Sequence, residues 1–223
     1  MAMRRSSAVC STSVLAAAVM ALALVVGMAG PVAAVPSLQV YVPGATYDTA
    51  TETWVTSSPE FDLQVIGAGY VYDVKLAAAL ITDQAPTTGS ITIGGSTFGP
   101  GDFVYGTPQL GDGSSLPPHG IYPAWYVSVP IGDFQPLYTV YDMQPGSSGS
   151  AMGEIKTIHV TVSGFDRVHF DVYDHVIVGG DHAKYVNNPF SHDGEYELPE
   201  PGTALLLGLG LAGLGVGARR RRR

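Results

Sequence analysis

The sequence has almost no cysteine and, away from its two ends, almost no positive charge. Cys10 is the one cysteine among 223 residues, so the chain can form no internal disulfide. Between residues 35 and 198 there are four strong bases and 18 acids, a net charge of −14. Binding to nucleic acid needs clustered Lys and Arg, so we expect no nucleic-acid partner. This acidity favours solubility outside the cell, and the alternative is binding of divalent cations.

Several familiar catalytic and metal-binding signatures are also missing. The sequence contains no HExxH pattern, no cysteine ligands after Cys10 and no EF-hand loop. Residues 146–150 read GSSGS and do not form the GxSxG elbow of a serine hydrolase. Paired carboxylates for glycoside hydrolysis cannot be chosen from 18 acids without geometry. We therefore expect a protein that is not an enzyme and that carries no resident cofactor.

The N-terminal segment, residues 1–34, has the three parts of a secretory signal peptide. Arg4 and Arg5 give a positive start, residues 14–26 are apolar, and small residues precede a cleavage point after Ala34. We expect a helical signal peptide that takes the chain through the general secretory route and is removed by signal peptidase.

The C-terminal segment, residues 198–223, joins a proline-rich motif to a short apolar span. Pro199, Glu200 and Pro201 precede 16 uncharged residues, 203–218, and five terminal arginines. A helix of that length measures roughly 24 Å, less than a hydrocarbon core of about 30 Å. The arginines should remain in the cytoplasm, which places the body of the protein on the other side of the inner membrane.

This order of Pro-Glu-Pro, short Gly/Leu helix and arginine tail resembles the PEP-CTERM sorting signal of Gram-negative bacteria. The resemblance implies recognition by an exosortase at Pro199, Glu200 and Pro201, which would be a substrate site and not catalytic residues. It also implies a stage of anchoring in the inner membrane, then delivery to the cell surface or the extracellular matrix.

The body, residues 35–197, has the pattern of an all-β domain. Short apolar or alternating segments are separated by Gly and Pro turns, which is typical of an antiparallel β-sandwich of jelly-roll type. We expect strands at residues 38–42, 51–56, 61–66, 70–82, 88–93, 122–131, 137–143, 154–162 and 168–178. Residues 99–120 are expected to form a long functional or mobile loop, residues 145–153 a flexible turn, and residues past 179 irregular structure.

The body also resembles the choice-of-anchor domain families, exported domains that carry different sorting tails. The stretches that carry this resemblance are 37–41, 44–48, 51–55, 116–122, 168–173 and 189–193. The resemblance implies no enzyme activity.

Two groups of residues are candidates for a metal site. His169 and Asp171 lie two positions apart and so share one face of an expected strand, and His192 is the third ligand that we consider. Asp102 and Asp112 in the long loop are candidates for Ca²⁺. The alternative is that all of these are ordinary surface-loop residues and a hydrogen-bonded strand histidine.

Trp125, with Tyr122 and Tyr126 beside it, is the candidate for stacking on a sugar ring. The alternative is that Trp125 is a core residue.

The sequence as a whole predicts an exported surface or matrix protein, a structural or adhesive component of the exopolysaccharide or biofilm layer. The alternatives are a carbohydrate-binding module and, third, a secreted hydrolase.

Overall fold

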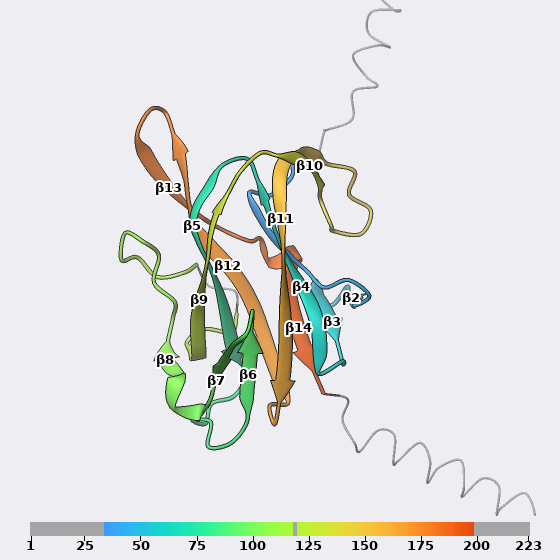
Figure 1. Cartoon of the computed structure of the whole chain (residues 1–223), viewed down its shortest axis with the longest axis vertical. Helices are drawn as coiled ribbons and strands as arrows, with labels where there is room; N and C mark the ends of the chain where they lie inside the picture. Colours follow the sequence, from blue (N-terminus) through green and yellow to red (C-terminus); the bar gives the residue numbers. More distant parts are fainter. Residues whose placement is uncertain (1–33, 118–119, 199–223) are drawn as a thin grey trace, which may run out of the picture. The chain divides into compact units, whose positions relative to one another are not determined.

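The computed structural model describes residues 34–117 and 120–198, which form two β-sheets packed as a sandwich (Figure 1). The first sheet contains β1 (Leu38–Tyr41), β4 (Glu60–Ala68), β6 (Ser90–Ile93), β7 (Ser96–Phe98), β10 (Tyr138–Tyr141) and β11 (Ser150–Ser163). The second contains β2 (Thr46–Asp48), β3 (Thr53–Thr56), β5 (Val71–Leu80), β8 (Val104–Gly106), β9 (Ala124–Phe134), β12 (Arg167–Val178), β13 (His182–Asn187) and β14 (Asp193–Glu197). Two 3-10 turns are η1 (Pro100–Asp102) and η2 (Phe190–His192).

The strand order explains how the end of the body reaches the middle of the second sheet. That sheet runs β2-β3-β14-β12-β5-β9-β8, and β13 also pairs with β12. Among the described strand pairs, β14 with β3 is the parallel one, and all others are antiparallel. The last strand of the body is therefore flanked on both sides by earlier strands.

The apolar core lies between the sheets and follows from residue alternation along the strands. Val168, Phe170 and Val172 of β12 face inward and pack with side chains such as Phe61 and Leu63 of β4. Burying one such side chain contributes about 1.5–3 kcal/mol, so these long strands supply much of the stability.

The opposite face of β12 is also buried, which is unusual for the outer face of a sandwich. A second, smaller cluster there joins Tyr173 and Ala77 to Leu110 and Leu116, with Tyr122 packed against it. Leu110, Leu116 and Tyr122 come from the segment between β8 and β9. The expected loop at 99–120 thus contains η1 and β8 and covers the second sheet.

Most of the expected strands are present, but two expectations were wrong. Residues past 179 are not irregular, because they form β13 and β14. The turn expected at 145–153 is shorter, because β11 begins at Ser150. In addition, β2 was not among the expected strands. The sequence DGEYE of β14 has one apolar side chain and so lacks the usual strand pattern.

The two-sheet sandwich is confirmed, whereas the jelly-roll order stays a prediction. The expected signal-peptide and membrane-spanning helices lie outside the described residues. Within the described part of the chain, no helix is both long and apolar enough to cross a membrane.

Two glycines of the first sheet have close neighbours, Gly67 of β4 against Phe134 of β9, and Gly153 of β11 against β4. A Cβ at Gly67 would lie 2.6 Å from the ring of Phe134. A Cβ at Gly153 would collide with the carbonyl oxygen of Gly67, a backbone atom that cannot turn aside. The strand pairing at this point therefore requires glycine for space.

We predict that Gly153→Ala lowers the free energy of unfolding of the full chain by about 3 kcal/mol, the upper end of usual overpacking costs. Gly101→Ala is the matched control, because a Cβ there meets no atom within 4 Å. Both full-length variants are purified in the same detergent, and urea unfolding of each measures the difference in their free energies of unfolding. Equal midpoints for the two variants would contradict the prediction.

Candidate metal centre

The pairing of β12 with β14 places four ionisable side chains on one outer face of the second sheet. In this antiparallel register His169 lies opposite Glu195 and Phe170 opposite Gly194. A Cβ at Gly194 would meet Val40 of the core, so that position faces inward. Alternation then directs its neighbours on β14, Asp193 and Glu195, to the outer face with His169 and Asp171.

These four side chains, which we call the outer-face cluster, are buried in spite of their charge. The exposed fraction is 3% for His169, 0% for Asp171 and Asp193, and 5% for Glu195. Taking several charges out of water costs several kcal/mol per ion unless partners compensate. The contacts of each residue in the cluster therefore matter.

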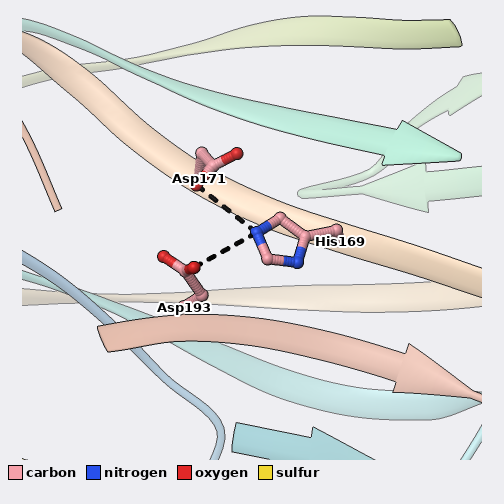
Figure 2. A group of neighbouring side chains, drawn as sticks. All are labelled: His169, Asp171 and Asp193. Atoms are coloured by element: carbon pink, nitrogen blue, oxygen red, sulfur yellow. Dashed lines mark ion pairs between the residues drawn. The ribbon is translucent and has the colours of Figure 1, made fainter. Parts of the chain in front are cut away.

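Figure 2 shows the Nε2 atom of His169 directed between the carboxylates of Asp171 and Asp193. Nε2 lies 3.5 Å from Oδ1 of Asp171 and 3.4 Å from Oδ2 of Asp193. These are ion-pair contacts, and the buried Nε2 makes no hydrogen bond. The other ring nitrogen, Nδ1, lies 3.4 Å from Oε2 of Glu195.

Three further side chains form hydrogen bonds with the carboxylates of the outer-face cluster. The hydroxyl of Tyr122 donates to Oδ2 of Asp171 at 2.8 Å. Asn188 Nδ2 donates to Oδ1 of Asp193, and Arg167 Nη2 donates to Oε1 of Glu195 at 2.6 Å. Asn188 is itself held in place, because its Oδ1 accepts a hydrogen bond from the backbone amide of Val172 in β12 at 2.7 Å.

The electrostatics of the outer-face cluster follow from this arrangement. Burial alone would lower the pKa of His169, but Asp171, Asp193 and Glu195 outweigh burial and hold it well above its ordinary value. Burial would raise the pKa of Glu195, yet hydrogen bonds from His169 and Arg167 leave it below its ordinary value. Burial, with Asp171 beside it, raises the pKa of Tyr122 well above that of a free phenol, so its hydroxyl remains a donor.

The structure brings together two of the three residues predicted as ligands, His169 and Asp171, and places Asp193 where His192 was expected. His169, Asp171 and Asp193 each offer one atom, and the three atoms lie within 4.8 Å of one another. His192 instead places Nε2 2.8 Å from Oδ1 of Asp142 and Nδ1 2.9 Å from Ser191. Asp193 and Glu195 were missed because we expected no strand there. The alternation of acids at 193, 195 and 197 was the available signal.

Asp102 and Asp112 each accept hydrogen bonds from residues of the turn in which they lie. Oδ2 of Asp102 accepts from the amide of Gly99 at 2.7 Å at the start of η1. Oδ1 of Asp112 accepts from the amide and hydroxyl of Ser114 at 2.9 and 2.6 Å. The described residues bring neither aspartate into a group with two further potential ligands.

The three aromatic candidates do not share one surface. Trp125 packs against the core between the sheets and contacts Tyr105, with ring centroids 5.3 Å apart. Tyr122 and Tyr126 meet edge to face at 6.2 Å, and the hydroxyl of Tyr122 is engaged by Asp171. A sugar-stacking platform that joins all three rings is therefore not formed in this arrangement.

Comparison with known families decides the nature of the C-terminal segment. Residues 197–222 match the PEP-CTERM protein-sorting motif. The chain carries a PEP-CTERM signal. This motif implies an exported protein that an exosortase sorts, and PEP-CTERM proteins are associated with the cell surface. Pro199, Glu200 and Pro201 lie inside the match and outside the described residues.

Comparisons of the whole chain with curated proteins and with solved structures found no match. The family of the body is thus not identified, and its resemblance to the choice-of-anchor families stays a prediction. The match to the sorting motif begins at Glu197, the last residue of β14.

A pH dependence is expected from Asp142, the carboxylate that contacts His192. Burial would raise its pKa, but hydrogen bonds from Ser147 and His192 lower it below the ordinary value. The unfolded chain then binds the additional proton first as the pH falls through about 4. The stabilisation is complete above that value and is lost as the pH falls through the folded pKa.

We predict that Asp142→Asn reduces the difference in urea midpoint between about pH 7 and about pH 3, since the titrating carboxylate is gone. Asp83→Asn, at an exposed position, is the control and should keep the dependence of the unmodified chain. The same pH dependence in all three proteins would show that Asp142 does not contribute.

Proposed function

We propose that the body is a non-catalytic module of the cell-surface or exopolysaccharide layer, with a structural or adhesive role in a biofilm of a Gram-negative bacterium. The observation that carries this proposal is the PEP-CTERM motif, which follows directly on β14. In this proposal, signal peptidase removes residues 1–34 and the C-terminal segment holds the chain in the inner membrane until an exosortase acts. Exopolysaccharide is the proposed partner of the mature body.

The burial of the outer-face cluster supports a role without catalysis. A glycoside hydrolase needs two carboxyl groups that face a bound sugar. Asp171, Asp193 and Glu195 are instead almost fully buried, and Tyr122 lies against Asp171. A polysaccharide chain therefore cannot reach these carboxylates in this conformation.

The sorting step is testable in a host that contains an exosortase. We predict that replacing Pro199, Glu200 and Pro201 together by alanine leaves the unprocessed chain in the inner membrane, because the recognition motif is lost. Fractionation of the cells and immunoblotting of each fraction measures this. Glu60→Ala, at an exposed position of the body, should be sorted as the unmodified chain is. Surface delivery of the triple variant would overturn this role of the motif.

A carbohydrate-binding module is the second candidate, and one observation favours it. Tyr70, Tyr72, His175 and Tyr185 form a row with successive ring centroids 6.4, 5.7 and 5.6 Å apart. Tyr70 is 57% exposed. However, Tyr72 stacks on both Tyr70 and His175, so these rings cover faces that a sugar would need. This geometry makes the structural role the better supported of the two.

A glycan array with the full chain in detergent separates these two functions. We expect no saturable binding to single oligosaccharides. Saturable binding that Tyr70→Ala abolishes, and that Tyr138→Ala at another exposed tyrosine retains, would assign the row as a sugar site and overturn our preference.

A further inference from the structure

We propose that His169, Asp171 and Asp193 bind one divalent transition-metal ion, best matched by Zn²⁺, and that this ion stabilises the exported body by joining β12 to β14. The inference goes beyond sorting and a surface role, and neither of those depends on it. It rests on the direction of the ligand atoms, on the residues that hold them, and on the charge of the outer-face cluster.

The first argument is the spacing of the three atoms that converge. A hydrogen bond from a ring nitrogen to a carboxylate should measure about 2.7–3.2 Å. The distances from Nε2 of His169 to Asp171 and Asp193 are longer, 3.5 and 3.4 Å. A tetrahedral ion with bonds of about 2.1 Å separates its ligands by about 3.4 Å. Nε2 makes no hydrogen bond to either carboxylate, and it lies at the spacing expected between two ligands of one ion.

The second argument is that the buried Nε2 of His169 makes no hydrogen bond although it points into this group (Figure 2). A buried polar nitrogen without a hydrogen bond destabilises the folded state. A metal ion between the imidazole and the two carboxylates would use the lone pair of Nε2 and remove that destabilisation.

The third argument is the support behind each ligand. Histidines that bind metals usually donate their other ring N–H to a carboxylate or carbonyl, and carboxylate ligands are hydrogen-bonded as well. Here Nδ1 of His169 faces Glu195, Oδ2 of Asp171 accepts from Tyr122, and Oδ1 of Asp193 accepts from Asn188. In each of the three residues, the nitrogen or oxygen atom that does not take part in the convergence has a partner of its own.

The fourth argument is charge. Arg167 pairs with Glu195 through two guanidinium nitrogens, at 2.8 and 2.6 Å, which offsets that carboxylate. Asp171 and Asp193 then carry two buried negative charges when ionised. A divalent ion bound to them and to neutral His169 brings this group to zero net charge. Buried charges are retained in proteins when they are paired or bind a metal.

The donor set selects the kind of ion. Ca²⁺ and Mg²⁺ prefer oxygen ligands throughout, whereas an imidazole nitrogen suits Zn²⁺ and its neighbours among the transition metals. The ion at this place therefore differs from the Ca²⁺ that the sequence suggested for Asp102 and Asp112. The three residues leave one tetrahedral position for water. Because the ligands are buried and Tyr122 lies against Asp171, the role of the ion is to stabilise the fold.

A metal would serve the body where a disulfide cannot. The chain has no cysteine after Cys10, and β14 is a strand of five residues with one apolar side chain. Folding and metal binding share their free energy when the ligands come from different strands. The ion would thus fix the last strand of the body to β12.

The first experiment uses the full chain, exported by a bacterial host and purified in detergent with a histidine-free affinity tag and without chelators. We expect about one equivalent of zinc or another transition metal per chain by inductively coupled plasma mass spectrometry. Removal of the metal with a chelator should lower the Tm. Zn²⁺ or Co²⁺ should restore it, and Ca²⁺ or Mg²⁺ should not.

A second measurement identifies the ligands without relying on stability. Co²⁺ added to the metal-stripped chain should give the intense visible absorption of a tetrahedral site with nitrogen and oxygen ligands. His169→Ala should lose both this spectrum and the bound metal. The matched control is His159→Ala, because His159 also lies between two acids, Asp62 and Glu60, but is exposed. This control should keep the metal and the spectrum.

The unmodified chain decides the question even if His169→Ala fails to fold. A purified chain without metal, a Co²⁺ spectrum equal to that of the free aqueous ion, and a Tm unchanged by Zn²⁺ would overturn the proposal. So would stabilisation by Ca²⁺ alone, or equal loss of the metal in His159→Ala. The outer-face cluster would then be an ion-paired group around a protonated His169.

Discussion

The contact between His169 and the carboxylates around it is the interaction on which the end of the body depends. β12 lies in the middle of the second sheet, and its outer face carries charge where a sandwich usually meets water. Because this face is buried, β14 and the segment between β8 and β9 must supply its partners. Asp193 and Glu195 come from β14, and Tyr122 comes from the segment between β8 and β9.

The sequence predicted the parts of the fold that follow from apolar alternation. The residues of β4, β5, β11 and β12 alternate or are uniformly apolar, and strands were expected at each place. β14 has no such pattern, because the groups that bury its acids are polar side chains on β12. A strand that is stabilised by charge pairing cannot be recognised until its neighbour in the sheet is known.

The same reason explains what could be predicted of the candidate site. His169 and Asp171 are two residues apart on one strand, so their common face was apparent from the sequence. Asp193 joins them through the pairing of β14 with β12, a contact between distant segments. His192, which we also considered as a ligand, lies in η2, and its side chain contacts Asp142 instead. The end of the chain was the simplest part to predict, since its motif is local.

A polar cluster also fixes the register of β14 more firmly than apolar packing would. In the observed register, Gly194 and Tyr196 occupy inward positions, and Asp193 and Glu195 face the histidine. A shift by one residue would turn both acids toward Val40 and Phe170 in the apolar core, where an ionised carboxylate is costly. Tyr196 alone offers too little apolar surface to exclude that shift. The outer-face cluster therefore determines the register of β14, whose last residue, Glu197, is also the first residue of the match to the sorting motif.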